Sequence, residues 1–126
     1  MSASQRNKGK AGEREAAQLL SDLLGIPLKR ALGQERDSGA DINDIPGWVV
    51  EVKRHQRPHI AAWWGQAVSA ALQAHKRPAV MYRANRKPWR VVVPLAWAGE
   101  DWHRQVAYTA EVSLEGFAYL VREGKS

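Results

Sequence analysis

The stretch that decides the fold runs from Gly39 to Arg54 and reads GADINDIPGWVVEVKR. Within it, Trp48–Lys53 is apolar except for two charges, a pattern that predicts a β-strand. Side chains alternate between the two faces of a strand, so Glu51 and Lys53 share a face with Val49. A carboxylate and an ammonium therefore lie two residues apart on one side of an apolar strand. The other face is formed by Trp48, Val50 and Val52.

The residues before this strand, Asp44–Gly47, have the composition of a turn. Such a turn would fold the preceding Asp-Ile step back along the strand and bring Asp41 near Glu51. Two carboxylates in one place bind a hard divalent cation through oxygen ligands. With Lys53 beside them to hold a phosphate or orient a water, the arrangement suits cleavage of a phosphodiester bond.

Other interpretations of these charges stay open. A Glu-Val-Lys tripeptide is also typical of the solvent-exposed face of an antiparallel sheet. Asp37 and Asp44 are rivals to Asp41 as a metal ligand. We prefer Asp41 because it begins the apolar step of the hairpin, whereas Asp44 lies in the turn.

The composition indicates a small basic domain. The chain has 126 residues, enough for one domain, and carries a formal net charge of +6. Such an excess of basic residues indicates nucleic acid as the first candidate for a binding partner and an anionic membrane surface as the second. No apolar run approaches membrane-spanning length. The chain has no cysteine, which excludes disulfides, thiolate zinc sites and cysteine nucleophiles and fits a reducing cytoplasm. We expect a cytoplasmic protein of a bacterial, archaeal or phage-infected host cell.

The N-terminal part predicts a flexible basic arm over residues 1–8 and a single domain over 9–126. A helix is expected over Gly9–Leu24, with Gly25 as its stop. Its apolar stripe places Glu13 on the buried side. Glu13 either stabilises the start of the helix through the dipole or enters the site as a third carboxylate. Basic residues of this region that could contact DNA are Lys8, Lys10 and Arg14.

The middle of the chain predicts further elements of an α/β fold. A short strand is expected over Leu28–Leu32, followed by a polar loop over Gly33–Gly39. This region offers phosphate ligands, as does the end of the Glu-Val-Lys strand, namely Arg30, Arg36, Ser38 and Arg54. A second helix over His59–His75 has an apolar stripe formed by Ile60, Trp64, Ala67, Val68 and Ala71. Gln66 lies off that stripe and is either simply exposed or a site residue.

The last part predicts two strands and a closing helix. Ala79–Arg83 and Trp89–Val93 are joined by a basic turn, Ala84–Pro88, which could be a second DNA contact. A short helix is expected within 94–105, and an extended segment within 106–112. Ser113 is suited to cap a final helix that stops at Gly124.

Taken together, the expected order of helices, strands and charged motifs resembles that of the PD-(D/E)XK nuclease superfamily, which has the restriction-endonuclease-like fold. Within this superfamily, the chain most resembles the small Holliday-junction-resolvase-like enzymes of archaea and phages. The motifs that carry the resemblance are Gly12–Glu15, Ser38–Asp41 and Glu51–Lys53, and it spans about residues 8–95. Two departures are visible. Ala40 stands where the superfamily has its namesake proline, and Ala70 stands where the exonuclease-like branch has a tyrosine.

The resemblance implies an α/β fold with a central mixed sheet flanked by helices. It also implies a metal-dependent endodeoxyribonuclease in which Asp41, Glu51 and the backbone carbonyl of Val52 bind Mg²⁺ or Mn²⁺. Lys53 would position the attacking water, and Glu13 would complete the acidic cluster. Gln66 would match a polar position of the family.

Three functions follow as expectations. The first is a Holliday junction resolvase acting on branched DNA, for which a homodimer with two sites is the natural geometry. The second is a less selective nicking or double-strand endonuclease of the same fold. The third is a non-catalytic DNA-binding protein built on a nuclease fold. The apolar residues Trp63 and Trp64 and the last helix are the expected places for a dimer interface.

Overall fold

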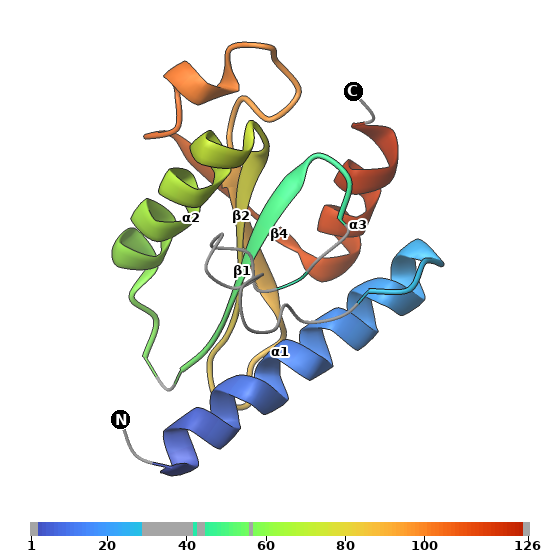
Figure 1. Ribbon diagram of the computed structural model, residues 1–126, viewed down its shortest axis with the longest axis vertical. Helices are drawn as coiled ribbons and strands as arrows, with labels where there is room; N and C mark the ends of the chain where they lie inside the picture. The colour runs from blue at the N-terminus through green and yellow to red at the C-terminus, as the bar shows by residue number, and fades with distance from the viewer. Residues whose placement is uncertain (1–2, 29–41, 43–44, 56, 125–126) are drawn as a thin grey trace.

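The computed structural model describes residues 3–28, 42, 45–55 and 57–124, with side chains from residue 11 onward. A four-stranded sheet in the order β1-β2-β3-β4 forms its centre, and helices lie on both faces (Figure 1). Strands β1 and β2 are parallel and the other neighbours antiparallel, so the sheet is mixed. The predicted α/β fold with a central mixed sheet is therefore confirmed. The elements are α1 Ala3–Leu24, β1 Trp48–Arg54, α2 Ile60–Ala74, β2 Arg77–Arg83, β3 Arg90–Pro94, the 3₁₀ helix η2 Trp102–Arg104, β4 Thr109–Ser113 and α3 Leu114–Glu123.

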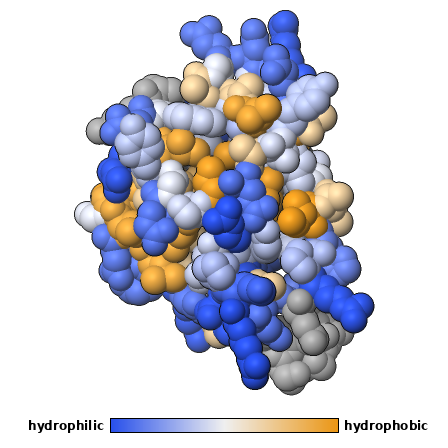
Figure 2. Space-filling model, turned by 180° about the vertical axis from the view of Figure 1, so that it is seen from behind, coloured by the Kyte–Doolittle hydropathy of each residue, from blue (hydrophilic) through white to orange (hydrophobic). Residues whose placement is uncertain are grey.

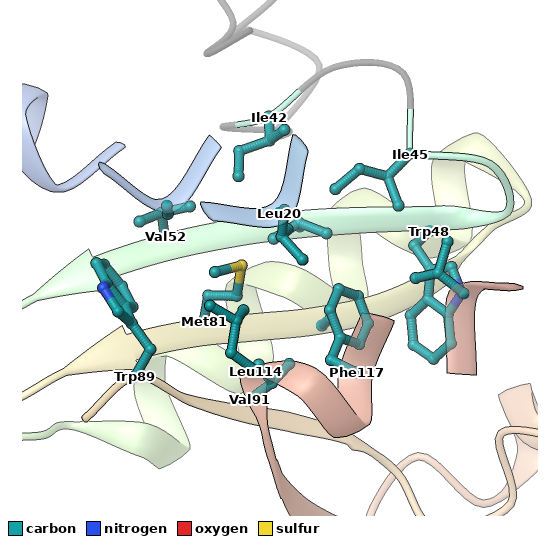
Figure 3. Packing of buried hydrophobic residues seen from close by; sticks show 14 of the residues in the cluster. Leu20, Ile42, Ile45, Trp48, Val52, Met81, Trp89, Val91, Leu114 and Phe117 are labelled. Carbon is teal, nitrogen blue, oxygen red and sulfur yellow. The ribbon is translucent and has the colours of Figure 1, made fainter. Parts of the chain in front are cut away.

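The larger part of the core lies between the sheet and the helices α1 and α3 (Figure 3). Phe117 of α3 is fully buried and meets the ring of Trp48 edge-on, with 5.1 Å between ring centroids. The opposite face of the sheet packs against α2 through two smaller apolar clusters. Both faces of β1 are thus covered, which explains why nearly the whole strand is apolar.

The hairpin expected before β1 is present in the part that the structure describes. The Trp48 amide donates to the Ile45 carbonyl over 3.2 Å, and Gly47 has a φ of 80°, as the third residue of a type II turn requires. Beyond this turn, Ile42 forms an antiparallel bridge with Val50. The chain therefore folds back along the outer edge of β1, as the turn composition predicted.

Helix α1 confirms the expected end and corrects the expected start. It ends at Leu24, and Gly25 follows with a φ of 70°. It begins at Ala3, however, so most of the expected flexible arm over 1–8 is helical. A polar segment without proline can extend a helix at little cost once a packed segment has nucleated it.

The buried face of α2 differs from the expected one. Its buried residues are Trp63, Ala67, Ala70 and Ala71, so the stripe is rotated and Trp63 lies in the core. Trp64 is half-buried, and its indole N–H donates to the Val106 carbonyl over 2.7 Å. The two tryptophans therefore do not form the exposed apolar surface expected for a dimer interface. Periodicity alone misplaced the stripe because alanine and tryptophan occur all round this helix.

The remaining elements follow the predictions closely. The Ser113 hydroxyl accepts a hydrogen bond from the Gly116 amide over 3.0 Å and caps α3, which ends before Gly124. The short helix within 94–105 is a 3₁₀ turn, and the extended segment after it becomes β4. Of the expected strand Leu28–Leu32, only Leu28 is described; it is buried and lies outside any strand, and the rest lies outside the described residues. Among the helices that the structure describes, none has the length and apolar character needed to cross a membrane.

Candidate active site

The centre of the candidate site is the Glu51–Lys53 pair on β1. Glu51 is 8% exposed, and its Oε2 lies 4.0 Å from the Nζ of Lys53, whose side chain is partly exposed. Alternation puts both on the face of Val49, which packs against Ala70 and Ala71 of α2. Because Lys53 reaches solvent, its ammonium can bind an oxyanion such as a phosphate. The buried carboxylate of Glu51 lies beside it.

Glu13 is buried on α1, as the stripe predicted, with 5% of its surface exposed. Its neighbour Gly12 explains how the helix comes so close to β1, because a Cβ at that position would lie 3.1 Å from the Cβ of Arg54. A larger residue there would push α1 away from the end of the strand. Within the described part of the chain, Glu13 and Glu51 are the two charged residues that are buried. They approach β1 from different sides, since α1 packs on the face opposite to α2.

Several predicted site residues lie outside the described residues. One of them is Asp41, the proposed first metal ligand. The others are the expected phosphate ligands Arg30, Arg36 and Ser38. Lys8 and Lys10 belong to helix α1, but their side chains are not among those described. Val52 is described, and its side chain packs in the core on the α1 face. Among the residues that are described, no three acidic or histidine side chains gather to form a metal-binding group.

Of the remaining DNA-binding candidates, Arg14 and Gln66 are exposed on α1 and α2. Arg54 is different, because its Nη1 lies 3.8 Å from Oε2 of Glu15 and its charge is partly offset.

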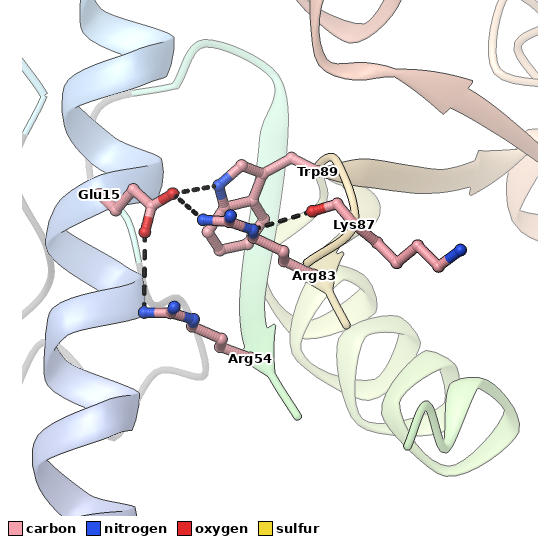
Figure 4. Close-up of polar contacts among 5 residues, drawn as sticks. All are labelled: Glu15, Arg54, Arg83, Lys87 and Trp89. Carbon is pink, nitrogen blue, oxygen red and sulfur yellow. Dashed lines mark hydrogen bonds and ion pairs between the residues drawn. The ribbon is translucent and has the colours of Figure 1, made fainter. Parts of the chain in front are cut away.

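Glu15 is a structural residue that sequence reasoning missed (Figure 4). Its Oε1 accepts hydrogen bonds from Arg83 over 2.6 Å and from the indole N–H of Trp89 over 2.9 Å. Together with the Arg54 pair, one carboxylate joins α1 to β1, to the end of β2 and to Trp89, which lies just before β3. Sequence carries no signal for this role, since the partners lie up to 74 positions away along the chain.

Replacement of Glu15 by alanine is expected to destabilise the fold by about 1–3 kcal/mol, because the buried Trp89 loses the acceptor of its N–H. Urea unfolding of Glu15→Ala measures this loss. In a Trp89→Phe background, which has no N–H to satisfy, the same change should cost clearly less. Equal costs in the two backgrounds would contradict the role assigned to the Trp89 contact.

Next to Lys53 lies a second polar group on the α2 face. Lys53 is opposite Tyr82 in the parallel register of β1 and β2. The Tyr82 hydroxyl donates to Oε1 of Glu111 over 2.5 Å, and Arg90 reaches the same oxygen over 3.1 Å. Burial, helped by the Glu111 carboxylate, raises the pKa of Tyr82 to about 12, so the phenol stays a neutral donor. Lys53, the partner of Tyr82 in the β1–β2 ladder, therefore lies opposite a neutral phenol and not a phenolate.

The donor set of the site fits a hard divalent cation. Glu51 supplies carboxylate oxygens and Val52 a backbone carbonyl, and the chain has no cysteine that would favour a softer metal. The buried position of Glu51 also fits, because a carboxylate taken out of water is stabilised by a cation at its oxygens.

Comparison with known proteins identifies a family. The model of the family described as "Phage putative PDDEXK endonuclease" matches residues 4–115. No curated protein sequence and no solved structure matches the chain. The matched range includes α1, the whole sheet and the Glu51–Lys53 pair, and PDDEXK nucleases generally use divalent metal ions. The fold, the buried carboxylate of β1 and this match together show that the chain belongs to the phage PDDEXK endonuclease family.

Proposed function

We propose that this member of the family is a Mg²⁺- or Mn²⁺-dependent endodeoxyribonuclease that cleaves branched DNA as a Holliday junction resolvase. The observation that carries the chemistry is the buried Glu51 beside Lys53, on a strand whose outer edge is bridged by Ile42. In an antiparallel ladder, the position before Ile42 is opposite the position after Val50. The proposal therefore pairs Asp41 with Glu51 at the edge of the sheet.

In this proposal, Asp41, Glu51 and the Val52 carbonyl hold the metal at the outer edge of β1. Glu13 reaches that edge from the α1 side of the sheet and completes the acidic cluster. A divalent cation supplies positive charge at the phosphoryl oxygens and lowers the pKa of a bound water. The chain's own contribution is to place these groups. Lys53 holds a non-bridging phosphate oxygen or orients the water, and its ammonium lies 4.0 Å from Glu51. Arg14, Arg54 and Gln66 contact the phosphate backbone on the way to the site.

Selectivity for branched DNA is proposed to rest on shape. Lys and Arg contacts to phosphates position a duplex without reading its bases, and the chain has a net charge of +6 for such contacts. A four-way junction is matched by a homodimer with two sites. On the face shown in Figure 2, hydrophobic residues form patches interrupted by hydrophilic ones.

A cleavage assay tests the proposal. We expect the protein to cut a labelled four-way junction at least about tenfold faster than a linear duplex of the same sequence, a difference of roughly 1.4 kcal/mol. Cleavage should require Mg²⁺ or Mn²⁺ and stop in chelator. Equal rates on both substrates would support the less selective endonuclease instead. Binding without cleavage under all metal conditions would support the non-catalytic DNA-binding protein.

A further inference from the structure

A shallow groove lies beside the hairpin that joins β2 and β3. Its volume is about 280 Å³, and its lining combines two prolines, a tyrosine edge and two cations. The lining residues are Pro58, Tyr82, Ala84, Lys87, Pro88 and Arg90. None of these side chains has a part in the chemistry assigned above.

The groove opens on the face of the sheet that carries the candidate site. Residues paired in a ladder point to the same face, so Tyr82 shares a face with its partner Lys53 in β1 and with its partner Arg90 in β3. Neighbouring strands are about 4.8 Å apart. The groove therefore begins one strand away from the Glu51–Lys53 pair, at the end of β1 where Lys53 lies.

The rim of the groove carries cations that are available to a ligand. Lys87 and its neighbour Arg86 are exposed, as is Arg57 before the Pro58 wall. Within the described part of the chain these three make no ion pair, whereas Arg90 is paired with Glu111. The surface around the groove is thus positively charged, and two of these three cations, Arg86 and Lys87, lie at the hairpin tip.

The tip is held in place by contacts below it (Figure 4). The Lys87 amide donates to the Ala84 carbonyl over 3.1 Å, and Nε of Arg83 donates to the Lys87 carbonyl over 2.9 Å. Arg83 is bound in turn to Glu15 of α1. A preorganised tip loses little conformational freedom when it meets a ligand.

We propose that this groove binds the sugar–phosphate backbone of the DNA arm next to the cleaved bond, an inference that rests on the proposed function. Lys87 and Arg86 meet successive phosphates, while Pro58 and Pro88 pack against the sugars between them. We assign the backbone rather than base edges as the occupant, because most hydrogen bonds from proteins to DNA go to phosphates and sugars. Arg90, the other cation of the lining, is already paired with Glu111. A DNA strand with one phosphate at Lys53 would continue along this face of the sheet to the hairpin tip.

The test compares two double variants that each remove two positive charges. Arg86→Asn with Lys87→Gln neutralises the tip, and asparagine tolerates the φ of 63° at position 86. The matched control, Lys76→Gln with Arg104→Gln, removes exposed charges beyond the opposite end of β2. Fluorescence anisotropy with a labelled four-way junction in chelator gives the dissociation constant at several salt concentrations. Thermal melts confirm that both variants are folded.

We expect the tip variant to bind about tenfold more weakly at moderate salt and to lower the slope of log K against log salt by about 2, one for each phosphate contact. The control should change the slope by less than about 0.5. A tip variant that matches the control in affinity and slope overturns the groove assignment.

This outcome is distinguishable from failure of the nuclease proposal. A wild-type protein that binds the junction but never cleaves it contradicts the proposed function, and the comparison of slopes in chelator still decides the groove. A wild-type protein that does not bind DNA overturns both.

Discussion

Glu51→Gln is expected to lower the cleavage rate by about a thousandfold or more, roughly 4 kcal/mol in the barrier. Glutamine keeps the shape of the side chain but removes the charge that we propose binds a metal, so the loss should appear in the chemical step. DNA affinity in chelator should change by less than about threefold, because phosphate contacts and not Glu51 supply the binding energy. Single-turnover kinetics and anisotropy measure the two effects separately.

The matched control is Glu100→Gln, which removes one negative charge from an exposed position. It should leave the cleavage rate unchanged within about twofold. Asp41→Asn is expected to behave like Glu51→Gln if the two carboxylates share a metal. A Glu51→Gln protein that cleaves within about tenfold of wild type sinks the assignment of Glu51 as a ligand.

Phe117→Ala is expected to cost about 3–5 kcal/mol of unfolding free energy, the range for truncating a buried aromatic residue. Phe117 is fully buried and packs edge-on against Trp48, the first residue of the strand that carries Glu51. Its loss opens a cavity between α3 and the sheet. Because marginally stable domains have only about 5–15 kcal/mol in total, the variant should unfold at much lower urea concentration.

Tyr119→Ala provides the control from the same helix. Tyr119 is 55% exposed, and surface substitutions usually change stability by about 0.5 kcal/mol or less. Urea unfolding of the two variants side by side separates loss of packing from loss of helix propensity. Similar costs for Phe117→Ala and Tyr119→Ala would contradict the central place of Phe117 in the core.

Much of the fold and part of the candidate site could be predicted from local patterns. The strand Trp48–Arg54, the turn before it and the Ser113 cap each depend on neighbours within a few residues. Alternation along that strand also places Glu51 and Lys53 on one face, since the period of a strand is set by backbone geometry alone. The burial of Glu13 followed from the helical period in the same way.

Other features were decided only when distant segments packed together. The sequence could not show that Glu15 joins β1, β2 and Trp89 to α1, because a carboxylate on a helix has many possible partners and only the packed structure selects them. It placed Trp63 outside the core for a related reason, as an apolar helix can turn more than one face to a sheet. Likewise, only the structure showed that the basic turn Ala84–Pro88 borders a groove. Parallel pairing of β1 with β2 brings this groove close to Lys53. Sequence alone thus determined the periods, turns and caps, which are local, whereas tertiary packing decided which charges meet, because contacts between distant residues depend on how whole elements dock.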